Sequence, residues 1–433
     1  MSTHLYHALF VVLLVGTEAF FSALAIVNLR HGERTVREER EWVEETLDVE
    51  DTERLTDYHR AKTGLSLLQS WVLLAGVLLV LYSGLFADAV AALQGTGLGE
   101  LGAGVVFVTG AVVLYSAAGW PFDLVDTFVV EEIFDFNNQT PRLWVRDRAV
   151  STAITVALVA PLTAAVLWLV GTVGPWWLAV WALYVVVSLA LQVLIPRVIA
   201  PLFYDFEPIE EGELRTGVED VFERAGFRCE QVYEMDASRR SSHSNAFFSG
   251  FGRTKRVVLF DTLVEHMELP EVQSVLAHEL AHWKKGHIWK LLAAGAVQAG
   301  VVLAALQFLL STEWLYAMFG VPETTHAGLL LALLWVLPVT RWTAPLQNRL
   351  SLAHEREADS FAVDVMGAGE PMADALSTLA GENLSNPFPH PWYAAFHHSH
   401  PPIPERIRYV REMAGETDDS GTGSGGDPAP DPT

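Results

Sequence analysis

The stretch "VLAHELAHWKKGH", residues 275–287, stands directly before a long apolar run that begins near Ile288. It places two histidines, His278 and His282, four residues apart, with Glu279 between them. Residues four apart share one helix face, so both imidazoles can bind the same metal ion. Glu279 can reach an attacking water without being a ligand. The pattern predicts two zinc ligands and a general base; the alternative is a polar helix face at a membrane interface.

Apolar segments on both sides of this motif are long enough to cross a membrane. Of the 433 residues, 51% are hydrophobic. Several stretches of about 20 residues contain no Lys or Arg, which is enough to span a bilayer core of about 30 Å. The first stretch lacks the basic start and cleavage site of a signal peptide, so we expect a retained anchor. The sequence predicts seven membrane helices, at about residues 5–27, 65–86, 101–120, 151–171, 176–195, 290–311 and 326–343.

Basic residues mark one side of the predicted membrane. Four segments on one side contain no Lys or Arg: 1–4, 87–100, 172–175 and 312–325. All 28 basic residues lie in or at the edges of the segments on the other side: 28–64, 121–150, 196–290 and 341–433. The positive-inside rule therefore predicts an N-terminus outside, with the large polar segments and the C-terminus in the cytoplasm.

The chain is strongly acidic. Its formal net charge is −24. An acidic surface disfavours nucleic acid and anionic lipid headgroups as partners, although the bilayer itself must be one. It suits a cytoplasm of high ionic strength, where about 1 M salt screens charges over about 3 Å. We expect a salt-loving host, and the alternative is an ordinary acidic membrane protein.

A catalytic zinc needs a third protein ligand and an open position. The stretch "NRLSLAHEREADSFA", residues 348–362, offers Glu355, with Asp359 one turn later on the same helix face. Asp359 can accept a hydrogen bond from a ligand imidazole and fix its orientation. His354 and Glu357 compete with Glu355 as ligands, and an ordinary helix salt bridge is the alternative for Asp359.

The order of polar and apolar segments predicts a protease domain in two halves. A β-prone, turn-rich stretch precedes the zinc motif, and helices follow the last membrane span. We expect five membrane helices with connectors in 1–195, the first half of the protease domain in 196–290, two membrane helices in 291–343, its second half in 344–413, and a disordered acidic tail in 414–433.

These segments resemble the type-I CAAX prenyl protease family of integral-membrane zinc endopeptidases. The likeness rests on "HELAHWKKGH", "NRLSLAHEREADSFA", "RSSHSNAFFSGFGRTKRVVLFDTLV" and "SHPPIPERI". The connector "DTFVVEEIFDFNNQTPRLWVRD" is a fifth and weaker match. One departure is Leu352, where the family usually has a basic residue. The resemblance implies a mainly α fold, in which seven membrane helices enclose a chamber and a cytoplasmic α+β domain holds the zinc.

The resemblance also implies the metal site. It makes Glu355 the third ligand of one Zn²⁺ per chain, beside His278 and His282. Zinc is inferred from the types of ligand, because the affinity order of divalent ions by itself favours copper. Glu18, an acid inside the first predicted span, either lines the implied chamber or caps a helix contact beside a hydroxyl.

Substrate-binding roles come from the same resemblance. Asn245 and Ala246 belong to an edge strand that would bind extended substrate by its backbone. His400 would stabilise the oxyanion near the scissile bond, and Arg406 would pair with acids around the metal, such as Asp359. From the residues alone, the His-Pro-Pro sequence at 400–402 is a helix-initiating turn.

The predicted function is a zinc-dependent membrane endopeptidase that hydrolyses peptide bonds near the C-terminus of prenylated or membrane-associated proteins and peptides. A quality-control protease resembling the heat-shock membrane protease branch is the alternative enzyme, although seven crossings favour the prenyl-protease branch. A non-catalytic scaffold or transporter with a structural metal is the alternative of another class. A scaffold would not need Glu279, and the internal repeats typical of transporters are not found in the sequence.

Overall fold

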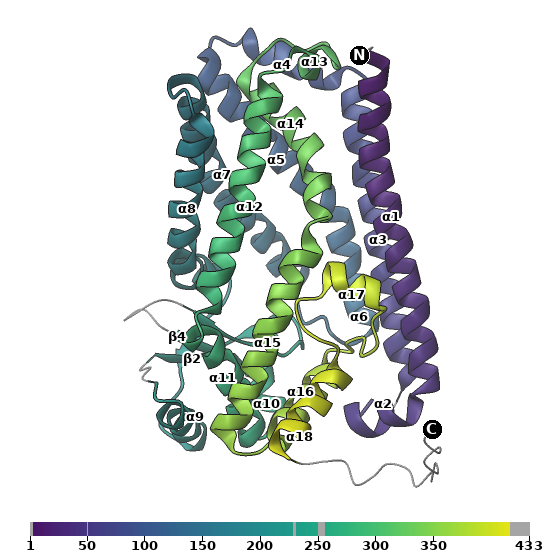
Figure 1. Ribbon diagram of the computed structural model, residues 1–433, viewed down its shortest axis with the longest axis vertical. Helices are drawn as coiled ribbons and strands as arrows, with labels where there is room; N and C mark the ends of the chain where they lie inside the picture. Colours follow the sequence, from purple (N-terminus) through teal and green to yellow (C-terminus); the bar gives the residue numbers. More distant parts are fainter. Residues whose placement is uncertain (1–2, 50, 228–230, 250–255, 416–433) are drawn as a thin grey trace, which may run out of the picture.

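The computed structural model describes residues 3–49, 51–227, 231–249 and 256–415. Long helices run side by side through most of its length, and a smaller unit of short helices and strands lies at one end (Figure 1). Within the described residues, six helices are long and apolar enough to cross a membrane, and a bent pair makes a seventh candidate. The predicted disordered tail beyond Gly415 lies outside the described residues.

Each predicted membrane span corresponds to a helix. These helices are α1 (Thr3–Glu38), α3 (Thr52–Tyr82), α5 (Gly99–Val125), α7 (Pro141–Thr172), α8 (Trp176–Leu194), α12 (His287–Leu310) and α14 (Thr325–Arg341). The second span ends earlier than expected, because Gly84 adopts φ +90° and separates α3 from the short helix α4 (Leu85–Gln94). A second short helix, α13 (Glu313–Ala317), lies at the same end of the molecule (Figure 1).

The last membrane helix leads directly into the protease unit. Helix α14 bends by 49° into α15 (Ala344–Met366), which carries the predicted third ligand. At the same end, α1 and α3 extend beyond their apolar parts into the charged segment, where α2 (Arg40–Leu47) lies between them in sequence. Helices α1 and α3, and helix α14 through its bend into α15, therefore connect the membrane part to the protease unit.

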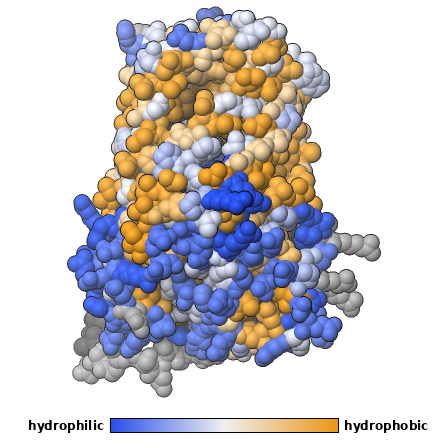
Figure 2. Space-filling view, turned by 180° about the vertical axis from the view of Figure 1, so that it is seen from behind, coloured by the Kyte–Doolittle hydropathy of each residue, from blue (hydrophilic) through white to orange (hydrophobic). Residues whose placement is uncertain are grey.

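An apolar surface covers the helical part of the molecule. Figure 2 shows hydrophobic residues over the long helices and hydrophilic residues over the end that holds the protease unit. Only 6% of the residues in the apolar windows of α3, α8 and α12 are buried. A helix that faces lipid on one side and an internal space on the other buries few residues, so this low burial agrees with helices around a chamber.

A four-stranded sheet organises the protease unit. Its strands are β1 (Phe206–Pro208), β2 (Val232–Met235), β3 (Ala246–Ser249) and β4 (Arg256–Phe260), in the order β1-β2-β4-β3. Strands β2 and β4 are parallel, whereas the other two pairs are antiparallel. β3 is therefore an edge strand.

Helices cover this sheet and form the core of the unit. They are α9 (Glu213–Arg224), α10 (Asp261–His266), α11 (Leu269–Lys284), α16 (Glu370–Glu382) and α18 (Ile403–Ala414), whereas α17 (Pro391–His397) packs against α15 and α1. Val218, Leu259, Leu263 and Leu276 are among the fully or almost fully buried side chains of this core. The core joins residues from before and after the last two membrane helices, so the two predicted halves form one packed unit.

The connector between the third and fourth spans is irregular. Helix α5 passes through Pro121, continues as a π-helical turn η1 (Asp126–Val130) and ends in the short α6 (Glu131–Ile133). Three further short helical turns are η2 (Ile195–Ile199), η3 (Ala200–Leu202) and η4 (Ala237–Arg239). Asn137 of the connector then forms a β-bridge with Ser241, which precedes β3. The connector thus contacts the protease unit beside its edge strand.

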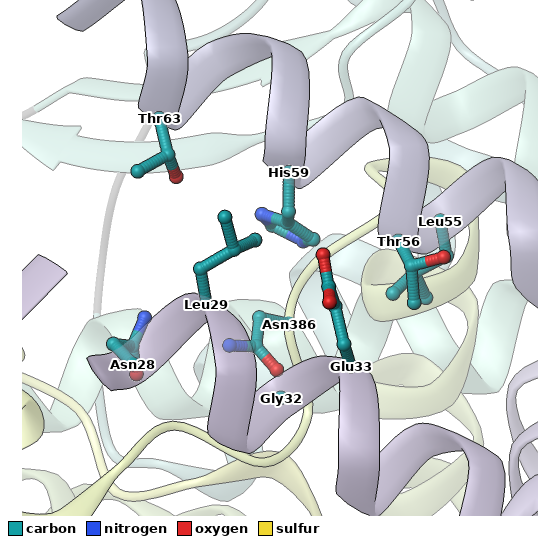
Figure 3. A pocket seen from close by; sticks show the side chains of 9 residues that line it. All are labelled: Asn28, Leu29, Gly32, Glu33, Leu55, Thr56, His59, Thr63 and Asn386. Atoms are coloured by element: carbon teal, nitrogen blue, oxygen red, sulfur yellow. The ribbon is translucent and has the colours of Figure 1, made fainter. Parts of the chain in front are cut away.

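A small cavity lies where α1 and α3 meet the loop before α17 (Figure 3). Its volume of about 20 Å³ is enough for one water molecule. Gly32 faces Asn386 there, and a Cβ at this glycine would come within 2.9 Å of the Asn386 amide nitrogen. The backbone N–H of His390 donates to Asn28 Oδ1 over 2.8 Å. The N-terminal helix thereby anchors the loop that leads to His400.

Candidate active site

Helix α11 carries the three residues of the zinc motif. A capping box, in which Glu268 and Glu271 each bond the backbone of the other, fixes its first turn together with Pro270. The helix ends before Gly286, whose φ of +69° turns the chain into α12. Its buried apolar residues belong to the core of the protease unit, so His278 and His282 are held on a firmly packed helix.

The two histidines converge on Glu355 of α15, which packs against α11. His278 Nε2 lies 3.4 Å from Glu355 Oε2, and His282 Nε2 lies 3.4 Å from Glu355 Oε1. One ligand atom from each residue falls within 4.8 Å of the others, in a group that could hold a metal ion. Two imidazole nitrogens and one carboxylate oxygen form a known set of protein ligands for catalytic zinc.

The other nitrogen of His278 contacts a buried acid. Asp359 Oδ1 lies 2.9 Å from His278 Nδ1, and Arg406 contacts the same carboxylate at 3.0 and 2.6 Å. Burial lowers the pKa of His278, but the hydrogen bonds to Asp359 and Glu355 outweigh burial and raise this pKa to about 9. The negative surroundings that favour a proton on His278 also favour a bound cation.

The other nitrogen of His282 is also held. His287 Nδ1 lies 3.1 Å from His282 Nδ1, and His287 Nε2 lies 3.0 Å from Glu357 Oε2. His287 is 1% exposed and stacks on His354 at 4.0 Å. Burial lowers the pKa of His282 to about 4, with a further contribution from His278. Both imidazoles therefore present Nε2 to the cluster while Nδ1 is occupied, which fits a metal site.

These contacts separate the competing residues of α15. His354 and Glu357 both lie around His287, outside the convergent group, whereas Glu355 faces the two histidines. The sequence reasoning missed His287 as a partner of His282. His287 is present in the quoted motif, five residues after His282. The spacing of residues along one helix could not show that the chain turns at Gly286 and places His287 against His282.

Glu279 and His400 lie close to the cluster, and each interacts electrostatically with its charged groups. Burial raises the pKa of Glu279 above its ordinary range, as is useful for a group that must accept and return a proton. His400 Nδ1 lies 2.6 Å from Glu355 Oε2, and the His400 side chain is 58% exposed. Helix α18 begins directly after Pro402, so the His-Pro-Pro turn both starts a helix and places His400 at the site.

Strand β3 lies beside the zinc-motif helix, because α11 packs on this strand. The Phe260 N–H donates to the Asn245 carbonyl over 3.1 Å, so the backbone polar groups of Asn245 face β4. Those of Ala246 then face the open edge, where its N–H donates to Asn245 Oδ1 over 2.8 Å. The strand thus offers backbone groups to an added strand at Ala246.

Glu18 forms an ion pair within the membrane part. Its carboxylate lies 2.8 Å from Arg341 Nη1, and the side chain is 14% exposed. Arg341 also lies 3.9 Å from the centroid of the Phe21 ring. The partner of Glu18 is therefore an arginine at the end of α14 rather than the hydroxyl considered from the sequence.

Comparisons with known proteins agree with this arrangement. The model of peptidase family M48 matches residues 208–414, and the model of the CAAX prenyl protease N-terminal region, with five membrane helices, matches residues 31–205. The chain is 35% identical over 316 residues to CAAX prenyl protease 1 homolog of Arabidopsis thaliana, covering 72% of this chain and 74% of the relative. It is 33% identical over 315 residues to CAAX prenyl protease 1 of Saccharomyces cerevisiae, covering 67% and 69%.

A solved structure shares the whole architecture. The crystal structure of S. mikatae Ste24p matches with a TM-score of 0.78 and 26% sequence identity, covering 91% of this chain and 99% of that chain. The match supports the predicted chamber fold of seven membrane helices. The chain therefore belongs to the CAAX prenyl protease family within peptidase family M48, and it is an integral, multi-pass membrane metalloprotease.

Proposed function

We propose that this protein is a zinc-dependent endopeptidase that cleaves near the C-terminus of prenylated or membrane-associated proteins and peptides. The observation that carries the proposal is the convergence of His278, His282 and Glu355 with both Nδ1 atoms occupied. These three residues would hold one Zn²⁺. The names of the related proteins, CAAX prenyl proteases, support the substrate class.

The chain's own residues supply the remaining parts of peptide hydrolysis. Bound zinc would provide Lewis-acid chemistry, which makes water a better nucleophile and polarises the peptide carbonyl. Glu279 accepts a proton from the attacking water and passes it to the leaving amine. His400 donates a hydrogen bond to the oxygen that becomes negative during the attack.

Substrate is bound through its backbone. An extended peptide adds to the open edge of β3 at Asn245 and Ala246, where the hydrogen bonds do not depend on the identity of the substrate side chains. Arg406 and Asp359 act indirectly, since they fix the orientation of His278. The residues with these roles come from two halves of the protease domain, 196–290 and 344–413. The membrane helices of 291–343 separate the halves in sequence.

The distribution of charge supports an active site on the cytoplasmic side. Basic residues gather at the end of the molecule that holds the protease unit, and the segments at the opposite end contain none. The N-terminus then lies outside, and both protease halves and the C-terminus lie inside. Lipid-anchored peptides would reach the site from the membrane part of the molecule, whose surface is apolar (Figure 2).

The test compares cleavage of a farnesylated C-terminal peptide with cleavage of its unfarnesylated twin. Purified protein in detergent at about 1 M salt is used because the acidic surface needs screening. Glu279→Gln should retain zinc and lose cleavage, and a chelator should abolish cleavage by the wild type until Zn²⁺ is restored. Preference for the lipidated peptide supports prenyl-protein processing.

The other outcomes contradict parts of the proposal. Equal cleavage of both peptides would replace prenyl-protein processing by general quality control of membrane proteins. Full hydrolysis by Glu279→Gln would overturn the assigned base. Cleavage that survives removal of all bound metal would overturn the zinc site.

A further inference from the structure

We propose that the connector of residues 126–137 positions the substrate-binding strand, with Glu131 as its central residue. The inference rests on the proposed function of the Asn245–Ala246 edge and adds a role for the N-terminal membrane region. In this view the membrane helices hold the segment that enters β3, and so set the geometry of the edge to which a peptide binds.

On the membrane side, Glu131 belongs to a group of charged residues. Lys62 Nζ on α3 lies 2.8 and 2.7 Å from the two oxygens of Asp126 and 2.7 Å from Glu131 Oε1. The Tyr58 hydroxyl donates to the same oxygen of Glu131 over 3.0 Å. One oxygen of Glu131 is therefore fixed by α3, and its other oxygen remains for a partner outside the membrane helices.

That partner is His243, three residues before β3. Its Nε2 lies 3.3 Å from Glu131 Oε2, and its ring stacks on Phe136 of the connector at 4.3 Å. The other ring nitrogen, Nδ1, lies 3.0 Å from Asn383 Oδ1. Glu131 is 15% exposed and His243 is 34% exposed, so these contacts are partly shielded from water.

Asn383 then holds the backbone immediately before the substrate edge. Its Oδ1 accepts from the Ser244 N–H over 3.1 Å, and its Nδ2 donates to the Ser244 carbonyl over 3.3 Å. The amide side chain therefore pairs with both backbone groups of one residue, as a neighbouring strand would. Asn245, the first residue of the proposed substrate edge, follows directly.

Backbone hydrogen bonds also attach the segment before β3 to the connector, on the N-terminal side of His243. The Ser242 N–H donates to the Phe136 carbonyl over 3.2 Å, and the Asn138 N–H donates to the Arg240 carbonyl over 3.1 Å. Arg240 also pairs with Asp147 of α7, with Nε 2.9 Å from Oδ2. The segment 240–244 is thus held by the connector, α7 and Asn383. The backbone groups of Ala246 face the open edge of the sheet, where the N–H donates to its neighbour Asn245 Oδ1 until a peptide replaces that acceptor.

This arrangement explains why so many polar residues occur in the connector. A pair of half-buried charges contributes more than an exposed pair, because solvent screens it less. If Glu131 loses its charge, Lys62 loses an ionic partner and His243 loses the carboxylate oxygen 3.3 Å from its Nε2, so the segment before β3 is less firmly held. Peptide binding would then weaken because the edge is no longer held ready for a peptide.

The experiment measures the dissociation constant of a fluorescent peptide on full-length protein carrying Glu279→Gln, so that the peptide is not consumed. Adding Glu131→Gln, which keeps the shape of the side chain, should weaken binding about tenfold. Asp123→Asn is the matched control, since Asp123 and Arg148, each 36% exposed, form a 2.8 Å pair between α5 and α7 that does not include the segment 240–244. It should leave peptide binding unchanged.

Further readouts separate positioning from general damage. In the otherwise wild-type enzyme, Glu131→Gln should raise KM about tenfold while kcat and zinc content change little. Asn383→Asp keeps the acceptor for the Ser244 N–H and should weaken binding less than Asn383→Leu. Unchanged peptide affinity in Glu131→Gln, or an equal loss in Asp123→Asn, would overturn the inference.

Failure of the proposed function would look different. Ala246→Pro removes an N–H that faces the open edge, so it tests peptide binding at β3 directly. If Ala246→Pro binds peptide as tightly as its parent, β3 is not the binding edge, and the proposed function fails at this point. If Ala246→Pro loses binding but Glu131→Gln does not, only the role of the connector is wrong.

Discussion

Asp359 Oδ1 lies 2.9 Å from His278 Nδ1, and this contact leaves Nε2 as the nitrogen that faces His282 and Glu355. Asp359 is fully buried, and Arg406 compensates its charge. We therefore expect Asp359→Ala to weaken zinc binding by about 10–100-fold, because the imidazole loses its orienting acceptor. Asp359→Asn keeps an acceptor oxygen and should weaken zinc binding less.

The measurement is the zinc dissociation constant from competition with a chelator, together with the unfolding temperature. Both variants leave Arg406 without its acid partner in a buried place, which should cost about 3–5 kcal/mol of stability. Asp359→Ala combined with Arg406→Met removes both charges and controls for that cost. Wild-type zinc affinity in Asp359→Ala would contradict the orienting role.

The contact between His282 and His287 predicts a second pair of variants. In His287→Asn the amide oxygen can replace Nδ1 as the acceptor for His282, so zinc affinity should stay close to the wild type. His287→Leu has similar bulk but no acceptor, and we expect about a tenfold loss of zinc affinity or more. Equal zinc affinities in the two variants would show that His287 acts by packing against His354 rather than by its hydrogen bond.

The open edge at Ala246 predicts the effect of a proline. Ala246→Pro removes an N–H that does not belong to the β3–β4 ladder, so the sheet should survive. Loss of the backbone hydrogen bond should weaken peptide binding by about 1 kcal/mol or more, which is roughly fivefold or more. Ala246→Ser retains the N–H and serves as the control in the same binding measurement. Stronger or unchanged binding by the proline variant would exclude β-augmentation at this residue.

The net charge of −24 predicts a dependence of stability on salt. Repulsion between acidic side chains destabilises the folded protein at low ionic strength, and about 1 M salt reduces the screening length to about 3 Å. We expect the unfolding temperature in detergent to rise between about 0.1 M and about 1 M KCl. An uncharged osmolyte at equal osmolality controls for general stabilisation. A flat salt response would favour the ordinary acidic membrane protein.

The membrane spans and the zinc motif were predictable because each is a local pattern. A span needs only a sufficient run of apolar residues, and two ligands on one helix need only the four-residue spacing of His278 and His282. All seven predicted spans are present as helices, with an early end at Gly84 as the main difference. Strand β1, which precedes α9, was not expected from the sequence.

The sequence by itself predicted the long apolar helices, the side on which basic residues gather, and the helix that presents two imidazoles. Helix spacing already puts Glu355 and Glu357 on different faces, but only the tertiary structure decided that the face of Glu355 turns toward those imidazoles while Glu357 reaches His287. It also paired Glu18 with Arg341 and Glu131 with His243. Such pairs join residues more than 100 positions apart, and their contact depends on how helices pack, which local spacing does not contain.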